Sequence, residues 1–429
     1  MAQDLTEIVK TQHSRKLFLG ITFEQLLLIL YPLCLIPAVL FWYRGLRRRR
    51  STSDVPAGCT RLGLKGASRT LDEFEKKYDK GNNDQSTWRV KALFAYPIKS
   101  CAGIELDEAE TNVEGFTYDR KFAFAEWLTP PGKKEPIWTF RTLRQNGYEK
   151  LALVRPEVWI PRQGNTTTQG NLKRVAQEGC LIVRYPNVPS GFLAPVDRLM
   201  LKWGLIPKEN SFRVPLHPGK NHKYPIETVN IWKDYPDWIN MAEHIPNDFK
   251  EWLGVKNPLA LFRAAPENYR NLFRCAPRKE EVGFQPVVAF PDSYPLHLLN
   301  IASVHEVGKH VGQAIDRLSL RRFRPNILME GPPVYDEDDW KRIAIGGNHL
   351  YSSCHTTRCK LPNIDPDTAE RHSEQPEKFL RTERNIDPGN KTSGCLGMQL
   401  VPAKDRAFSL NVGMGIEVLE RGEHYYLKT

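Results

Sequence analysis

The sequence predicts a β-rich α+β protein with one N-terminal transmembrane helix, and three observations support this fold class. From residue 88 onward, short runs of β-branched and aromatic residues alternate with glycine and aspartate turn signals. Helical patterns appear only near residues 234–253 and 301–311, which favours a β-barrel-rich architecture over a doubly wound sheet. Near the N-terminus, one uncharged apolar run is long enough to cross a bilayer.

Residues 17–43 are predicted to form the transmembrane anchor. The segment Leu26–Tyr43 carries no charged side chain, and as a helix it would span about 27 Å, close to the hydrocarbon thickness of a bilayer. A buried core helix and a cleaved signal peptide are the alternatives. A signal peptide would have small residues after its apolar run, whereas Trp42, Tyr43 and five arginines follow here. By the positive-inside rule, these arginines place the rest of the chain on the cytosolic side.

On either side of the anchor the chain is polar. Residues 1–16 are predicted to be an N-terminal tail, and residues 44–87 contain many polar residues and glycines, which is typical of a tether. Beyond the tether we expect short strands. In chain order they are Val90–Tyr96, Lys121–Trp127 and the runs LALVRPEVWI, CLIVRYP, LALFRAA, PNILMEG, RIAIGGNHLYSS, QLVPA and GIEVLERGEHYYLK.

The composition is that of a folded protein with reduced thiols. With 41% hydrophobic residues, the 429-residue chain can bury a sizeable core, and its length suggests two to three folding units. Its eight cysteines have no repeated spacing, unlike those of secreted disulfide scaffolds, so we expect free thiols in a cytosol-like compartment. The net charge of +11 includes five arginines directly after the apolar run, so it does not indicate a nucleic-acid partner.

The stretch CHTTRCKLPNIDPDT, which begins at Cys354, contains the strongest candidate for a reactive site. A structural zinc site needs four ligands, and no second cysteine or histidine pair stands nearby. A disulfide between Cys354 and Cys359 would close a very small loop in a reducing compartment. Cys359 lies between Arg358 and Lys360, and cations favour the thiolate form that binds metals and attacks electrophiles. Zinc, a disulfide and a purely structural cysteine stay open as alternatives to a reactive or metal-binding thiolate.

Asp365 and Asp367 in the same stretch have the spacing of a general acid/base pair or of a calcium loop. We favour an Asx-type turn instead, because Pro366 fixes φ and aspartate side chains readily accept hydrogen bonds from nearby backbone amides. The two carboxylates are therefore predicted to be structural.

Several motifs resemble the MOSC domain, and in particular its mitochondrial amidoxime-reducing component (mARC) branch. TTRCKLPNIDPDT followed by GCLGMQL resembles the cofactor-cysteine segment of that family. YPIKSCAGIELDEAE and YDRKFAF resemble the preceding β-barrel module, and FPDSYPLHLLNIASVHEV and RRFRPNILMEG resemble the middle motifs. The motifs occur in the family's order between residues 88 and 426. The resemblance implies a MOSC N-terminal β-barrel-like domain at residues 88–255 and a MOSC β-barrel domain at residues 256–429.

The chain departs from the family pattern at three places. Ala369 stands where the family has a glycine, and alanine is less comfortable than glycine in a left-handed backbone conformation. A polar insertion lies between about residues 205 and 245, and Gln399 stands where an aromatic residue is common. We expect the last two departures to affect substrate access.

The resemblance implies a molybdenum cofactor, molybdenum-molybdopterin, whose pterin dithiolene and one protein cysteine supply sulfur ligands to the metal. It makes Cys359 both the metal ligand and the catalytic residue, and it gives Cys354 no ligand role. The pterin ends in a phosphate, for which lysine, arginine and serine are suitable partners. The other residues carried over as cofactor-binding are Lys99, Ser100, Arg120, Ser303, Arg324, Asn326 and Arg358.

The activity implied by the resemblance is the reduction of N-hydroxylated small molecules, such as amidoximes and hydroxylamines, by a membrane-anchored molybdenum oxidoreductase. No flavin, haem or dinucleotide motif is visible in the sequence, so electrons would come from outside the chain, in this family from cytochrome b5 and NADH-cytochrome b5 reductase. Two alternative functions stay open: a MOSC-type sulfur-transfer protein and a non-catalytic carrier of the molybdenum cofactor.

The resemblance places the protein in the mitochondrial outer membrane, with the catalytic part facing the cytosol. The endoplasmic reticulum membrane is the alternative, because charge patterns distinguish these two membranes poorly. The physiological substrate and the oligomeric state cannot be predicted from the sequence.

Overall fold

A computed structural model describes residues 55, 56, 58–162, 178–218 and 224–427, together with positions 28, 30, 31, 35 and 39. Asp54–Pro186 and Ser211–Thr429 form one compact unit, the main unit. Met1–Ser53 and Asn187–Asn210 form the other, in which α4 (Ala194–Lys202) is described.

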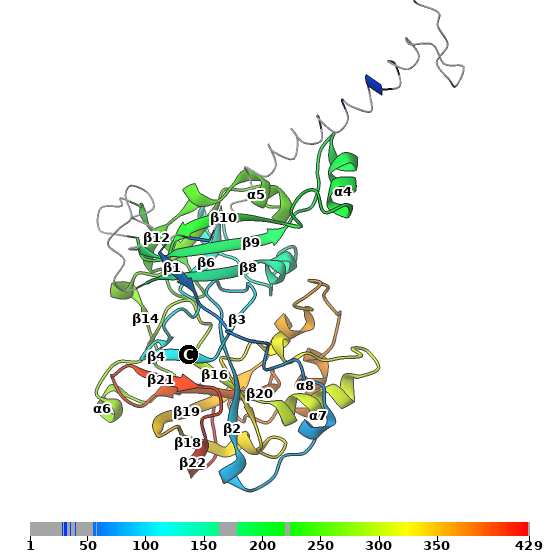
Figure 1. The fold of residues 1–429 in the computed structure, drawn as a ribbon. Coiled ribbons are helices and arrows are strands. Elements are labelled where there is room, and N and C mark those ends of the chain that lie inside the picture. The colour runs from blue at the N-terminus through cyan, green and yellow to red at the C-terminus, as the bar shows by residue number, and fades with distance from the viewer. Residues whose placement is uncertain are drawn as a thin grey trace, which may run out of the picture. The chain divides into compact units, whose positions relative to one another are not determined.

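An eight-stranded mixed sheet forms the first half of the main unit (Figure 1). Only β16 and β17 run parallel, and every other neighbouring pair is antiparallel. In sheet order the strands are β22 (Ile416–Arg421), β18 (Trp340–Ile345), β19 (Asn348–Thr357), β20 (Cys395–Pro402), β16 (Leu296–Asn300), β17 (Ile327–Glu330), β2 (Arg89–Ala95) and β3 (Ile104–Leu106).

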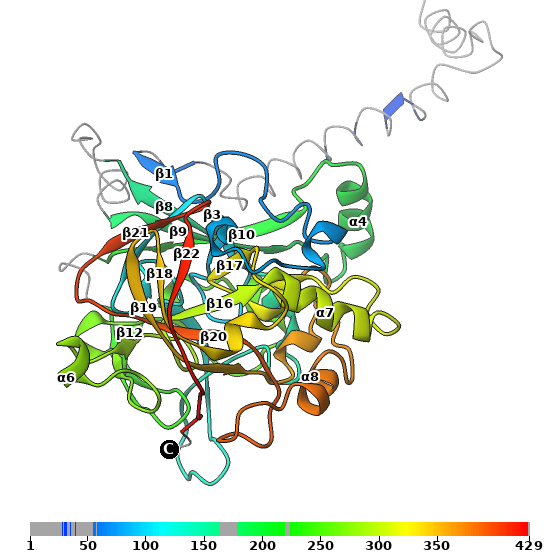
Figure 2. The same ribbon diagram turned by 90° about the horizontal axis from the view of Figure 1, so that it is seen from below.

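Both faces of this sheet are buried at its centre, because neighbouring apolar residues point to opposite sides. Leu298 packs into the cluster around Trp340, whereas Leu299 packs against helix α7 (Ile301–Val311) on the other face. Helix α8 (Glu377–Glu383) lies beside α7, and both contact β20 (Figure 2). Alternation of side chains along a strand explains why the sequence shows continuous apolar runs here.

A closed five-stranded barrel forms the second part of the main unit. Its strands are β11 (Ile226–Asn230), β12 (Asp237–Asn240), β13 (Leu259–Arg263), β6 (Phe122–Leu128) and β7 (Ile137–Phe140). The barrel has no free strand edge, which protects it from pairing with other chains.

Three smaller sheets complete the main unit. The first contains β1 (Cys59–Arg61), β8 (Arg155–Pro161), β9 (Cys180–Pro186) and β10 (Glu209–Pro215), which belongs to the main unit from Ser211 onward. The second contains β21 (Phe408–Asn411), β4 (Glu108–Asn112) and β5 (Gly115–Phe116), and the third pairs β14 (Arg270–Asn271) with β15 (Val287–Val288). The remaining helices are α5 (Asn247–Leu253) and α6 (Lys279–Val282), with the 3-10 helices η1 (Lys76–Tyr78), η2 (Gln85–Thr87), η3 (Glu149–Leu153), η4 (Ala242–His244), η5 (Pro266–Asn268), η6 (Leu320–Phe323), η7 (Asp336–Asp339) and η8 (Leu361–Asn363).

The predicted β-rich α+β class and the predicted helix at 301–311 are confirmed. The helix predicted over 234–253 is wrong in its first part, where strand β12 pairs with β11 and β13. Only Asn247–Leu253 is α-helical, and Gly254 ends it in a left-handed conformation (φ 84°).

The predicted transmembrane anchor at residues 17–43 lies outside the described residues, apart from the five isolated positions, and it stays a prediction. No helix in the described parts of the chain combines the length and apolar character needed to span a bilayer. Part of the predicted tether is folded, because β1 pairs with β8 and the buried carboxylate of Glu73 accepts the backbone N–H of Leu320 at 3.0 Å. The boundary predicted at residue 255 also stays a prediction.

An aromatic cluster beside the four-stranded sheet provides a test of the core. Phe249 of α5 is fully buried, and its ring lies 5.2 Å from Phe124, 4.9 Å from Tyr185 and 5.3 Å from Phe212. Burial of such a side chain typically contributes several kcal/mol, since truncation leaves a cavity.

We predict that Phe249→Ala lowers the free energy of unfolding by about 3–5 kcal/mol in denaturant titrations followed by tryptophan fluorescence. Phe192, which is 97% exposed, is the matched control, and Phe192→Ala should change stability by less than about 0.5 kcal/mol. Equal unfolding midpoints for the two variants would contradict the assignment of this cluster to the core.

Candidate functional site

A cavity of about 1030 Å³ in the main unit brings together segments that are far apart in the sequence. It has the size expected of a site for a cofactor or substrate. Eight of its lining residues are lysine or arginine, and only two are aspartate. This excess of positive charge indicates an anionic ligand. The cationic residues are Lys99, Arg120, Arg144, Lys233, Arg270, Arg274, Arg324 and Arg358.

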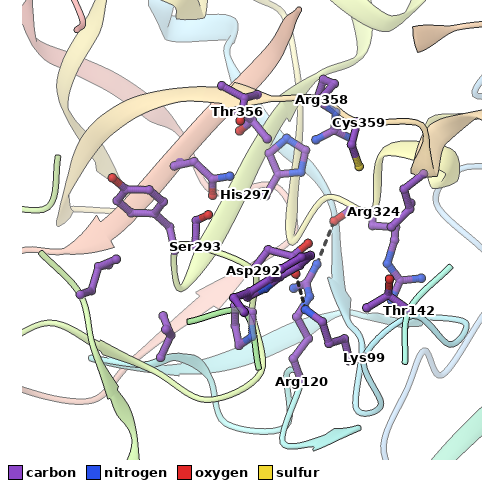
Figure 3. Close-up of a pocket in the computed structure, with 18 of the residues that line it drawn as sticks. Lys99, Arg120, Thr142, Asp292, Ser293, His297, Arg324, Thr356, Arg358 and Cys359 are labelled. Carbon is purple, nitrogen blue, oxygen red and sulfur yellow. Dashed lines mark hydrogen bonds and ion pairs between the residues drawn. The ribbon is translucent and has the colours of Figure 1, made fainter. Parts of the chain in front are cut away.

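The structure brings seven of the eight residues predicted for the site to this one cavity. Figure 3 shows the labelled side chains of Lys99, Arg120, Arg324 and Arg358 around a common space, into which the sulfur of Cys359 points. Their predicted roles toward a cofactor stay predictions. The seven residues are Lys99, Ser100, Arg120, Arg324, Asn326, Arg358 and Cys359.

Ser303 is the exception, and its placement does not support the predicted role in cofactor binding. It is fully buried in the first turn of α7 and is not part of the cavity lining. Its hydroxyl donates to Glu337 Oε2 at 3.1 Å and accepts the backbone N–H of Tyr335 at 2.9 Å. Asn300 caps the helix and so fixes the direction in which Ser303 points. Ser303 therefore links the start of α7 to the segment of Tyr335 and Glu337, and its predicted role toward a cofactor stays a prediction.

Arg120, Arg324 and Asn326 form a hydrogen-bonded group on one wall. Arg120 donates through Nη1 to Asn326 Oδ1 at 3.1 Å and through Nη2 to the Arg324 carbonyl at 3.3 Å. The guanidinium groups of Arg120 and Arg324 both lie over the ring of Tyr96, at 4.8 Å and 4.2 Å from its centroid, respectively. Burial lowers the pKa of Arg324 to about 10, whereas for Arg120 the opposing effect of Asp119 raises the pKa overall. Two cations held on one ring repel each other until an anion binds between them.

Lys99 extends into the cavity from the loop after β2. Its Nζ donates to the Phe290 carbonyl at 2.7 Å and pairs with Asp292. The side chain is only 5% exposed, and burial lowers the pKa of Lys99 to about 8, although Asp292 opposes that effect. Ser100 follows it, and the Ser100 hydroxyl accepts the backbone N–H of Leu143 at 3.2 Å.

Arg358 and Cys359 follow the end of β19. Arg358 donates to the Phe323 carbonyl at 2.8 Å, and its guanidinium lies 5.1 Å from the ring of Phe323. Burial lowers the pKa of Arg358 to about 10, and the neighbouring Cys359 thiol opposes this shift. Cys359 is partly exposed to the cavity, so its sulfur is accessible to a ligand.

The remaining side chains of the CHTTRC stretch are directed elsewhere. Cys354 is fully buried between Tyr294 and Val401 and does not line the cavity, and both Cys354 and Cys359 are free thiols. The two ring nitrogens of His355 are each 3.0 Å from a partner, Asp387 Oδ2 and the Asp338 carbonyl. His355 is therefore unavailable to the zinc site considered above.

Four buried polar atoms of the lining have no hydrogen-bond partner, and two of them belong to residues that sequence reasoning missed. They are His297 Nε2, Thr356 Oγ1, Arg324 Nη2 and Arg358 Nε. Buried polar atoms are normally satisfied, so these four indicate a polar ligand. Burial, together with Arg358 and Arg120, lowers the pKa of His297 well below its usual value, so the ring is neutral. The signal that could have identified His297 in the sequence is a polar histidine inside the apolar strand LHLLN.

Strained backbone is concentrated at the same cavity. Seven non-glycine residues of the described chain have left-handed φ values, and five of these line the cavity. Such conformations cost about 1–3 kcal/mol each and persist where the surroundings or function require them. The five are Ser100 (φ 69°), Arg120 (47°), Trp232 (59°), Arg274 (32°) and Arg324 (54°).

The predicted Asx turn is confirmed. Asp365 Oδ1 accepts the backbone N–H groups of Asp367 at 2.9 Å and Thr368 at 3.1 Å. Ala369 adopts the left-handed conformation (φ 61°) for which the family has a glycine. Of the other two departures, the insertion at 205–245 contributes Trp232, Lys233 and Asp234 to the cavity, and Gln399 also lines it.

The chain is similar to two described domains and to several named proteins. Residues 285–418 match the MOSC domain, and residues 87–176 match the MOSC N-terminal beta barrel domain. Mitochondrial amidoxime-reducing component 1 of Xenopus laevis is 31% identical over 319 residues, which cover 74% of this chain and 78% of that protein. Mitochondrial amidoxime reducing component 2 is 30% identical over 311 residues in Macaca fascicularis and 21% over 314 residues in Bos taurus, with 72% of this chain and 76% of the relative covered in both cases.

The lowered pKa of Lys99 predicts that anions bind this cavity less tightly as the pH rises through about 8, because the ammonium group loses its proton. Sulfate keeps its charge between pH 6.5 and 9, so calorimetric titration of the ligand-free protein with sulfate reports the change. We expect about tenfold weaker binding at pH 9, in line with the loss of one charged hydrogen bond. Lys99→Met should bind weakly at both pH values, and an unchanged pH dependence in this variant would contradict the role of Lys99.

Proposed function

Because the chain belongs to the mitochondrial amidoxime-reducing component family, we propose that it is a molybdenum-dependent oxidoreductase that reduces N-hydroxylated compounds to the corresponding amines. In the reaction, a substrate R–NH–OH takes up two electrons and two protons and gives R–NH₂ and water. The observation that carries the proposal is the accessible thiol of Cys359, which opens onto a cavity with eight cationic lining residues.

The residues present fit a cofactor that combines a soft metal with a phosphate. A thiolate suits a metal that already has sulfur ligands, and Cys359 meets this requirement without a second protein ligand. Lys99, Ser100 and Arg120 would hold the phosphate, because lysine, serine and arginine are effective phosphate partners. The unsatisfied atoms of Arg324 and Arg358 would donate to the pterin. When bound, the molybdenum cofactor supplies the two-electron chemistry that breaks the N–O bond.

The protein itself would orient the reactants. A hydrogen bond to the Phe323 carbonyl fixes Arg358, so its cationic group is held beside Cys359. His297, which is neutral, and Thr356 provide polar atoms to the cavity lining without adding charge. The hydrogen bonds within the group of Arg120 and Asn326 keep this wall rigid before the substrate arrives.

We further propose that electrons come from cytochrome b5 and NADH-cytochrome b5 reductase, and that the apolar segment at residues 17–43 anchors the protein in the mitochondrial outer membrane. The apolar run and the arginines that follow it support the anchor and a cytosolic catalytic part. The names of the relatives support the mitochondrion.

Replacing Cys359 by alanine should lower benzamidoxime reduction more than about 100-fold, since the loss of a metal ligand exceeds the typical effect of a group that only supports one. Cys354→Ala is the matched control and should keep most of the activity, because Cys354 does not line the cavity. Turnover is measured with a reconstituted cytochrome b5 chain, and molybdenum content is measured in parallel.

The opposite pattern, an inactive Cys354→Ala and an active Cys359→Ala, would refute the assignment. A wild-type protein that contains molybdenum but does not reduce benzamidoxime would point to a carrier. Sulfur release in place of reduction would point to a sulfur-transfer protein.

Deleting residues 1–50 should move the protein from the membrane fraction to the soluble fraction and leave its molybdenum content unchanged, because the cavity is built from residues after 98. In intact organelles, added protease should digest the full-length chain from residue 51 onward. A truncated protein that still sediments with membranes would argue against the anchor, and protection from protease would reverse the proposed orientation.

A further inference from the structure

A tryptophan occupies an unfavourable turn position at the edge of the cavity. Ile231 and Asp234 exchange two backbone hydrogen bonds of 3.0 Å, so Trp232 and Lys233 form a two-residue hairpin turn. Trp232 has a φ of 59°, a left-handed conformation that such turns usually assign to glycine, asparagine or aspartate. The backbone at Trp232 is strained, and strain of this kind often accompanies a function of the side chain.

The indole of Trp232 serves as a platform for Arg144. The Arg144 guanidinium lies 4.6 Å from the indole centroid, and the ring of Phe140 packs edge-on against the same indole at 5.0 Å. Phe140 is buried at the end of β7, so its ring provides a fixed contact for the indole. An arginine stacked on an aromatic ring keeps its N–H groups free at the edge of its plane, where they can form a two-point contact with an oxyanion.

Arg144 also differs from the other arginines of the cavity in its partners. In the described part of the chain, its guanidinium forms no hydrogen bond and no ion pair, although its charge acts on Asp292. By contrast, the other cavity arginines are already bound: Arg120 to Asp119, Arg270 to Asp234, Arg274 to the Tyr426 hydroxyl, Arg324 to the Cys101 carbonyl and Arg358 to the Phe323 carbonyl.

Arg144 and Cys359 reach the cavity from different segments of the chain. Cys359 follows β19, whereas Arg144 comes from the loop after β7 and is exposed, unlike the buried Lys99. Of the cationic residues that line the cavity, Arg358 directly precedes Cys359 in sequence and interacts with its thiol. Because Arg144 is exposed and Arg358 is the cation beside the thiol, we assign Arg144 to the end of a substrate that does not react.

We propose that Arg144, held on Trp232, is a specificity-determining residue that binds an oxyanion on the non-reacting end of the substrate. The substrate class is then N-hydroxylated compounds that carry a carboxylate or a similar anionic group. This inference rests on the proposed function and narrows it, since the reaction alone requires no charge on the substrate. A role for the Trp232 indole in holding Arg144 explains the strained turn.

The test compares three benzamidoximes with different groups at the 4-position: a carboxylate, a neutral carboxamide and a trimethylammonium group. In the wild-type holoenzyme with its electron donor, kcat/KM should be highest for the carboxylate and lowest for the cation. Arg144→Gln should lower kcat/KM for the carboxylate about fivefold, mainly through KM, which corresponds to one partly exposed ionic contact. Its effect on the neutral compound should stay within about twofold, and Arg144→Lys should restore part of the preference.

Arg317 provides the matched control, because it is an exposed arginine stacked on an aromatic ring outside the cavity. Its guanidinium lies 4.1 Å from the centroid of Phe74, and Arg317→Gln should leave all three substrates unaffected. Calorimetric binding of the three compounds to the holoenzyme without electron donor should show the same order of affinity, and it provides a measurement independent of turnover. Molybdenum content should be equal in wild type and Arg144→Gln.

Four results would overturn the inference in different ways. An equal loss for all three compounds would show that Arg144 does not read the charge of the substrate. Loss of molybdenum from Arg144→Gln would show that the arginine serves the cofactor. A wild-type protein that reduces none of the three compounds would refute the proposed function, and the inference with it, whereas reduction of all three at the same kcat/KM would refute the inference alone.

Discussion

The side-chain amide of Asn326 is the contact on which the rest of the cavity depends. Its Oδ1 accepts from Arg120, a residue 206 positions away, and from the backbone N–H of His297 at 3.2 Å, while its Nδ2 donates to the Phe94 carbonyl at 3.1 Å. One fully buried side chain therefore joins the strand before the Lys99 loop, the turn at Arg120 and the strand that carries His297. Buried networks of this kind are rigid when all members are satisfied, and a single hydrogen bond to a charged group contributes about 1.5–3 kcal/mol.

This arrangement gathers positive charge at a cost in folding free energy. Burial lowers the pKa of Arg324 and of Arg358 to about 10 and that of Lys99 to about 8, so each of these cations is destabilised relative to water. Left-handed backbone at Ser100 and Arg120 adds further strain. An anionic ligand would relieve the repulsion and satisfy the unpaired buried atoms, so binding and stability of the holoprotein are linked. The cavity is therefore preorganised for a ligand, and this preorganisation lowers the stability of the protein without the ligand.

Sequence reasoning succeeded where a local signal determines the structure. The Asx turn at Asp365 was predictable because the chemistry of the turn lies within four residues, and helix α7 was predictable from its apolar spacing. The placement of Ser303 outside the cavity lining was not predictable, because the motif NIAS does not reveal which side of the first helical turn faces the cavity. It did not find Arg144 and Trp232, since their stack joins two loops whose approach depends on the closure of the barrel. Long-range contacts of this kind leave no pattern in a single sequence.

The coordination of molybdenum by Cys359 is the central claim, and X-ray absorption at the molybdenum K-edge of the purified full-length protein tests it most directly. The cavity geometry predicts one sulfur ligand beyond the pair supplied by the dithiolene, because the Cys359 sulfur is the accessible thiol at the cavity wall. A molybdenum site with only the dithiolene sulfurs, or a protein that contains no molybdenum when produced in cells that make the cofactor, would contradict it.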